Sequence, residues 1–176
     1  MQTLLVPPPP LTPLQRRLVW IVALLVAATR VFALSKTIWD WDEAQFASGV
    51  RDVEVGPYHH PHPPGFPVYI GLAKLVRLVA PSEFAALQTV VFLAACALFP
   101  LGFLLARELR FRFSTAVLGP LLFCFLPNVW FYGGTAFSDI PGVALALAAA
   151  MMLLRGCRSP RAYLLGALLL GLASGM

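Results

Sequence analysis

The chain has 176 residues, of which 59% are hydrophobic and only 12% are charged, and its mean hydropathy is +0.79. Soluble domains are about half apolar and a quarter charged, so this composition excludes an ordinary soluble enzyme and predicts a polytopic protein of the lipid bilayer. The formal charge of +5 comes largely from basic residues at the ends of apolar runs. That placement is typical of membrane topology signals and argues against nucleic acid as a partner.

The first 17 residues form a proline-rich leader, which we expect to be disordered and cytoplasmic. Residues 18–34 are apolar except for Thr29 and Arg30. As a helix they would rise about 26 Å, slightly less than the bilayer core of about 30 Å, and Arg30 is expected to snorkel from the helix end. The alternative is a cleaved signal peptide, with Ala33-Leu34-Ser35 as the cleavage site. A retained span is favoured, because the leader is long and further spans follow.

A long loop at 35–83 separates this first span from the next one. Its first part, 35–64, is polar and carries five carboxylates: Asp40, Asp42, Glu43, Asp52 and Glu54. A short helix is expected over 42–53, since two acids in the first turn suit the helix dipole. Residues 66–80 are apolar but place Lys74 and Arg77 on one helical face. We therefore expect 66–80 to lie in the membrane surface rather than to cross it.

Four further apolar segments follow, at 84–106, 113–132, 140–154 and 162–176. Pro120 and Pro127 interrupt the second of them, which a membrane bundle tolerates. The expected fold class is all-α, a polytopic transmembrane helical bundle of about five spans with a short interfacial helix in the first outer loop. Because the last segment has no closing loop, residues 18–176 are expected to be the N-terminal part of a larger transmembrane domain.

The charged residues also predict an orientation. If the N-terminus is cytoplasmic and 66–80 does not cross, one side of the membrane receives a set of eight arginines: Arg16, Arg17, Arg107, Arg110, Arg112, Arg155, Arg158 and Arg161. The acidic loop and Asp139 then lie together on the other side. Cationic loops stay in the cytoplasm, so the acidic loop is expected outside. The Ala/Arg/Pro-rich composition fits a multi-pass protein of a bacterial inner membrane.

Asp42 and Glu43 are the first candidates for chemistry, because carboxylates retained at a membrane surface often mark functional sites. Neighbours on a helix point about 100° apart, so one carboxylate can face a substrate while the other holds the loop. Asp139 is the third candidate and follows Ser138 at the start of a span. The plainer interpretations are a solvated acidic loop for the pair, and for Ser138 and Asp139 an N-cap worth about 1 kcal/mol. A capping carboxylate can still face a cleft.

Three histidines, His59, His60 and His62, lie in a stretch stiffened by four prolines: Pro61, Pro63, Pro64 and Pro67. Such a cluster suits a metal ion or, when protonated, a phosphate. The plainer interpretation is a rigid exposed turn. A zinc site would need ligands beyond these histidines, so a divalent metal is not favoured and no cofactor is expected. The three cysteines lack a CxxC pairing and are expected to be free thiols: Cys96, Cys124 and Cys157.

The order of these motifs resembles the polytopic glycosyltransferases of the GT-C superfamily, in particular the protein O-mannosyltransferase and aminoarabinose transferase group. An acidic pair after the first span, Asp42-Glu43-Ala44, is followed by a proline-rich entry into an amphipathic helix, His62-Pro63-Pro64-Gly65-Phe66-Pro67-Val68-Tyr69. A later outer turn then carries Ser138-Asp139-Ile140-Pro141. The resemblance covers about residues 14–176.

The resemblance implies transfer of a sugar from a polyprenyl-phosphate donor to a hydroxyl of a lipid, glycan or protein acceptor outside the membrane. Asp42 would be the general base of an inverting single displacement. Glu43 and Asp139 would shape the cavity or hold the acceptor. The substrate-binding residues would come from the proline-rich motif: His59, His60, His62 and Tyr69.

The chain departs from the family pattern where the phosphate contacts are expected. An Arg shortly after the acidic pair is replaced by Gln45 and Phe46, and a Lys before the two prolines is replaced by His62. His62, when protonated, is the expected substitute. The isolated fragment is expected to be inactive, since the resemblance places further substrate-binding residues in later spans.

Two other functions remain open from the sequence. One is a transporter or channel fragment, in which charged groups inside the spans would mark the pathway. The span interiors hold almost no charge apart from Arg30, which does not favour this interpretation. The other is a non-catalytic membrane subunit, which would keep the same spans without a working site.

Overall fold

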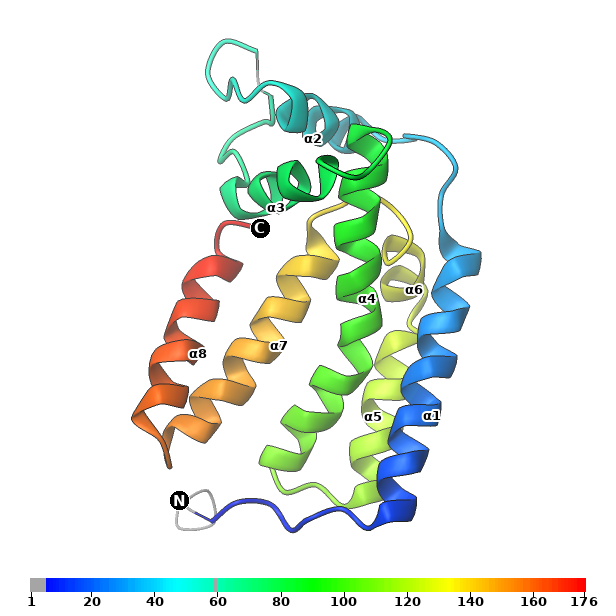
Figure 1. Ribbon diagram of the computed structural model, residues 1–176, viewed down its shortest axis with the longest axis vertical. Coiled ribbons are helices and arrows are strands. Elements are labelled where there is room, and N and C mark those ends of the chain that lie inside the picture. The colour runs from blue at the N-terminus through cyan, green and yellow to red at the C-terminus, as the bar shows by residue number, and fades with distance from the viewer. Residues whose placement is uncertain (1–5, 59) are drawn as a thin grey trace.

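The computed structural model describes residues 6–58 and 60–176. These residues form eight α-helices and one short 3-10 helix, and they contain no β-strand. Figure 1 shows long helical columns running in roughly the same direction, with short helices lying across one end. The predicted all-α fold is therefore confirmed.

The first column is α1 (Pro13–Arg30), which begins several residues before the expected apolar segment. Thr12 is its N-cap: the Thr12 hydroxyl accepts a hydrogen bond from the Gln15 amide, and the Gln15 side chain accepts one from the Thr12 amide. This reciprocal pair is a capping box, and Pro13 suits the first helical position. A short 3-10 turn, Val31–Ala33, ends the column.

The centre of the bundle is α4 (Glu83–Glu108), which packs against α1, α5, α7 and the short helix α3. Its buried residues include Leu87, Val91, Leu98, Phe99 and Phe103. On one side of α4, α7 (Asp139–Gly156) and α8 (Pro160–Ala173) form a helical hairpin in which α7 contacts α4. Helices α4 and α7 are each long and apolar enough to cross a membrane, whereas α8 is apolar but shorter.

The segment 113–132, expected to be one span interrupted by Pro120 and Pro127, is broken at only one of these prolines. The chain forms α5 (Phe113–Cys124), breaks, and resumes as α6 (Pro127–Tyr132). Pro127 has no amide hydrogen to donate, and it forces Leu126 into an extended conformation with ψ of 134°. Pro120, by contrast, lies within α5 without ending it.

Arg30 occupies this break, so the prediction that Arg30 snorkels from the helix end is wrong. Its side chain is fully buried. Its Nη2 donates to the Cys124 carbonyl at 2.6 Å, and its Nη1 donates to the Val129 carbonyl at 3.3 Å. The Cys124 carbonyl ends α5, whereas the Val129 carbonyl lies in the first turn of α6 and also accepts from the Gly133 amide at 3.2 Å. The guanidinium therefore bridges the break between the two helices.

The two ends of the bundle differ in charge. The acidic end carries α2 (Trp41–Arg51), α3 (Pro67–Arg77) and the turn between α6 and α7, and Figure 1 shows α2 and α3 lying across it. These two helices match the expected elements at 42–53 and 66–80, except that α3 ends three residues earlier. The basic end carries the turns after α4 and α7, where the buried Glu108 carboxylate pairs with Arg155 at 2.7 Å and Arg158 at 2.6 Å.

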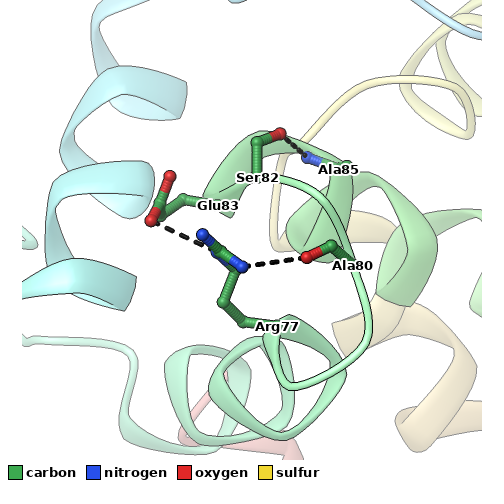
Figure 2. A network of polar contacts seen from close by, with 5 residues as sticks. All are labelled: Arg77, Ala80, Ser82, Glu83 and Ala85. Carbon is green, nitrogen blue, oxygen red and sulfur yellow. Dashed lines mark hydrogen bonds and ion pairs between the residues drawn. The ribbon is translucent and has the colours of Figure 1, made fainter.

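A polar turn joins α3 to α4 at the acidic end, as Figure 2 shows. The Arg77 guanidinium donates to the Ala80 carbonyl at 2.9 Å and to the Glu83 carboxylate at 3.2 Å. Ser82 caps α4 by accepting from the Ala85 amide at 3.1 Å. Arg77 therefore fixes the corner between the two helices, and Lys74 remains exposed on α3.

Candidate active site at the acidic end

The start of α2 determines where the acidic pair points. Asp40 is the N-cap, and its carboxylate accepts a hydrogen bond from the Asp42 amide at 2.9 Å. Asp42 and Glu43 therefore both fall in the first helical turn, as expected. Because adjacent helical positions diverge by about 100°, their side chains enter different surroundings.

Glu43 is fully buried beneath α2. Its Oε1 accepts from the Ala136 amide at 2.7 Å, and its Oε2 accepts from the Trp39 amide at 3.0 Å. Each carboxylate oxygen thus holds a separate loop. In this position Glu43 organises the surrounding backbone, and it has no solvent-facing surface from which to touch a substrate.

Tyr69 completes the same arrangement from α3. It is fully buried, and its hydroxyl donates to the Ala136 carbonyl at 2.7 Å. Burial raises the pKa of the Tyr69 phenol well above its usual value, and the nearby Glu43 and Asp139 carboxylates raise it further. The phenol therefore stays protonated and donating. Both polar backbone groups of Ala136 are held by side chains from the segment 35–83.

Asp42 points the other way and remains accessible, with 45% of its side chain exposed. Its Oδ1 faces Nδ1 of His62 across 3.9 Å, which is too long for a hydrogen bond. The His62 ring is held between Phe46 and Phe66, with ring centroids 5.6 Å and 5.1 Å away. Its Nδ1 is buried without a hydrogen-bond partner. The two side chains are therefore fixed near each other, with unused hydrogen-bonding capacity between them.

His60 and His62 make different contacts. The backbone of His60 exchanges hydrogen bonds of 2.8 Å and 3.0 Å with that of Glu54, closing a tight loop. His62 alone packs beside Asp42, and His59 lies outside the described residues. Across residues 6–58 and 60–176, no three His, Cys, Asp or Glu side chains gather as a metal site would require.

The loop that contains His60 and His62 packs closely against α2. A Cβ atom added to Gly49 would lie 2.6 Å from the Pro61 ring, so only glycine allows this approach. Pro64 and Gly65 then line a cavity of about 340 Å³ together with Lys74 of α3. The ammonium group of Lys74 is a cation that the sequence interpretation had assigned only to the membrane surface.

Asp139 is the first residue of α7 and is exposed. The expected N-cap is not formed, because Ser138 adopts a helical conformation and makes no side-chain capping bond. Asp139 instead lines a cavity of about 350 Å³ with Asn128, Tyr132 and Phe137. The residues that surround this cavity include neither Asp42 nor Glu43, so the three predicted acids divide into one buried and two separately accessible carboxylates.

Two groups that the sequence analysis did not single out help to hold the acidic end together. Gln88 of α4 donates from Nε2 to the Ser35 carbonyl at 2.8 Å and to the Gly134 carbonyl at 2.9 Å. Trp39 packs against Phe131 and Phe137, with ring centroids 5.4 Å and 5.9 Å away. A glutamine within an apolar run was the available signal for the first contact.

Comparisons of the chain with protein-family models, with curated proteins and with solved structures return no match. The resemblance to GT-C glycosyltransferases therefore rests on motif order alone. What the site can do is argued below from its geometry.

Proposed function

We propose that this protein is an integral membrane glycosyltransferase that moves a sugar from a polyprenyl-phosphate donor to an acceptor hydroxyl. The observation that carries the proposal is that the two residues of the acidic pair have different surroundings. Glu43 is buried and occupied by two backbone amides, whereas Asp42 is accessible and faces His62. A rigidly mounted, accessible carboxylate is what a general base requires.

In this proposal the helical columns cross the bilayer of a bacterial inner membrane in five passes, with α5 and α6 sharing one pass. The acidic end faces outward, and the arginine-rich basic end faces the cytoplasm. The end of α3 and the turn after it support the surface placement, because Leu75, Leu78 and Val79 are 65%, 82% and 89% exposed. Apolar side chains of this size next to Lys74 suit the boundary between lipid tails and headgroups.

The proposed reaction is a single displacement at the anomeric carbon. The acceptor oxygen forms a bond to that carbon while Asp42 takes the hydroxyl proton. The bond between the anomeric carbon and the phosphate oxygen breaks, and its electron pair leaves with the polyprenyl phosphate. Attack opposite to the leaving group inverts the configuration. The phosphate is already a stable anion, so the reaction needs no second carboxylic acid, in contrast to glycoside hydrolysis.

The departing phosphate requires positive charge close by. Lys74 lines the cavity of about 340 Å³ beside Pro64 and Gly65, and protonated His62 would be a second cation. The walls of this cavity are otherwise mostly apolar, with Val53, Val55 and Ile70 among them. An ammonium group at the edge of an apolar cavity suits a phosphate attached to a lipid chain. The proposed step uses no cofactor.

The proposed chemistry is the same for a hydroxyl of a lipid, a glycan or a protein acceptor. Glu43 and Tyr69 would support the site from below by fixing the Ala136 peptide. Asp139 follows that peptide by three residues and would act on the substrate from its own cavity.

The direct test is sugar transfer by the protein expressed from its natural reading frame and reconstituted in lipid. Asp42→Asn is expected to lower turnover by roughly 10²–10⁴-fold, the usual effect of removing a positioned general base. Asp52→Asn is the matched control, because Asp52 is an exposed carboxylate at the other end of α2. Near-normal turnover of Asp42→Asn would refute the assignment of the base. Donor binding without any transfer would instead indicate a non-catalytic membrane subunit.

A further inference from the structure

A second cavity of the acidic end lies beside Asp139. Its volume is about 350 Å³, and α6, α7 and the turn between them supply its walls. Asn128 and Tyr132 come from α6, Phe137 from the turn, and Asp139 from the start of α7. Ile140 and Val143 complete an apolar side. Three polar side chains therefore converge on a mostly apolar cavity, which is the usual composition of a small-molecule site.

The polar groups restrict what this cavity can bind. The Asp139 carboxylate, when ionised, only accepts hydrogen bonds, whereas the Asn128 amide and the Tyr132 hydroxyl both donate and accept. No lysine or arginine lines the cavity. A phosphate would be repelled by the carboxylate and would find no cation. A ligand with several hydroxyl groups, or with an amine, would satisfy all three side chains.

The aromatic residues add a second restriction. Phe137 packs edge to face against Tyr132, with centroids 5.2 Å apart and ring planes at 81°. It also contacts Trp39, and both Phe137 and Tyr132 are only partly buried. The rings are thus held by neighbours while part of their surface remains open. Rigid aromatic surface beside hydrogen-bonding groups matches the apolar face and polar edge of a pyranose or furanose ring.

We propose that this cavity is a glycosyl-binding subsite, in which Asp139, Asn128 and Tyr132 hold the hydroxyl or amino groups of a sugar ring. The inference rests on the proposed function, because it assigns the sugar of that reaction to this cavity.

Backbone hydrogen bonds connect the cavity beside Asp139 to the first turn of α2, which carries Asp42. Trp39 donates its amide to Glu43 and packs its ring on Phe137, two residues before Asp139. The Ala136 peptide, which immediately precedes Phe137, is held by Glu43 and Tyr69. The subsite and Asp42 are therefore mounted on the same hydrogen-bonded frame.

Ligand binding to the wild-type protein in lipid nanodiscs tests the inference without any turnover. The probes are a neutral methyl hexopyranoside, a methyl glycoside of an amino sugar, and inorganic phosphate, each followed by saturation-transfer NMR and titration. We expect at least one glycoside to bind. Asp139→Asn and Tyr132→Phe should each weaken it roughly tenfold, the equivalent of one lost hydrogen bond to a charged or well-placed group. Asp52→Asn should leave its affinity unchanged.

The outcomes separate this inference from the proposed function. Glycoside binding that both variants weaken, in a protein that transfers no sugar, would refute the transferase and leave the sugar site standing. Sugar transfer with unchanged KM values in both variants would refute the subsite and leave the transferase standing. Binding of phosphate in place of glycosides, or glycoside binding that neither variant alters, would also overturn the subsite. Tyr132→Phe covers the case in which Asp139→Asn fails to fold.

Discussion

The Glu43 carboxylate and the Ala136 amide, 93 positions apart in the chain, are joined by a buried hydrogen bond of 2.7 Å. The bond ties the first turn of α2 to the turn that begins α7. Because Glu43 also accepts from the Trp39 amide, its removal would leave two backbone donors without partners. The acidic pair thus contains one residue that supports the fold and one that is available for chemistry.

Glu43→Gln should therefore lower stability while Asp42→Asn should not. A glutamine side chain has one oxygen, so it can satisfy one of the two amides and must turn its own NH₂ group toward the other. Leaving one buried donor unsatisfied costs about 1–3 kcal/mol. Thermal unfolding of the purified protein in one detergent measures both variants. Equal Tm values for Glu43→Gln and the wild-type protein would contradict the structural role.

Tyr69 predicts a specific dependence of stability on alkaline pH. Its pKa is raised in the folded protein, so the unfolded chain loses the phenolic proton first as pH rises. The stabilisation is complete below the ordinary pKa of about 10 and is lost as pH rises above it. Tyr69→Phe should lower Tm at pH 8, since a lost hydrogen bond costs about 1 kcal/mol. Its Tm should then fall less steeply between pH 9 and 11 than that of the wild-type protein.

The control for this measurement is Tyr163→Phe. Tyr163 is 56% exposed at the basic end of the bundle. This variant should keep the alkaline decline of the wild-type protein. Parallel pH curves for Tyr69→Phe and the wild-type protein would show that the phenol does not titrate with unfolding.

Membrane orientation can be tested with one natural and one introduced cysteine. Cys157 is exposed at the basic end, and Tyr58 is 63% exposed in the loop at the acidic end. In intact cells a membrane-impermeant maleimide should leave Cys157 unmodified until the membrane is permeabilised. Tyr58→Cys, in a Cys157→Ser background, should react from outside. Labelling of both positions in intact cells would contradict the proposed topology.

Glu108 predicts a stability effect at the opposite end. Glu108 is 2% exposed, and its carboxylate joins α4 to the last turn of α7 through Arg155 and to the turn after α7 through Arg158. Glu108→Gln removes the charge from two charge-assisted hydrogen bonds, each worth about 1.5–3 kcal/mol when the partner is buried, and less here because Arg155 is partly exposed. Tm should fall clearly. Arg161→Gln, at an exposed position on the neighbouring turn, should change Tm little.

Much of the fold could be predicted from apolar runs and their charged ends. The boundaries of α4 and α7 follow the hydropathy pattern, because a long apolar helix leaves few alternatives. The divergence of Asp42 and Glu43 also follows from helical geometry. Which of the two becomes buried does not, since the deciding partner, Ala136, is an alanine whose side chain carries no signal.

The remaining discrepancies share a physical cause, which is that distant backbone groups decide local structure. Pro127 marked a weak point in the expected third span, but nothing beside it in the sequence indicated that Arg30 would bind a carbonyl on each side of the break. Close spacing of His60 and His62 suggested a shared ligand site, yet the backbone of His60 pairs with that of Glu54 while the ring of His62 packs against Phe46 and Phe66. Sequence proximity says little about side-chain direction in a loop closed by such a pairing.

The contact of Arg30 with both sides of the break between α5 and α6 has a mechanical consequence. A proline break in a helix can act as a hinge when its freed carbonyls exchange partners during motion. Here the guanidinium of Arg30, the last residue of α1, donates to both the end of α5 and the first turn of α6. Bending at the break would require α1 to move as well. Arg30 therefore restrains the break between α5 and α6. The turn that carries Asp139 then keeps its position and direction relative to the segment 35–83.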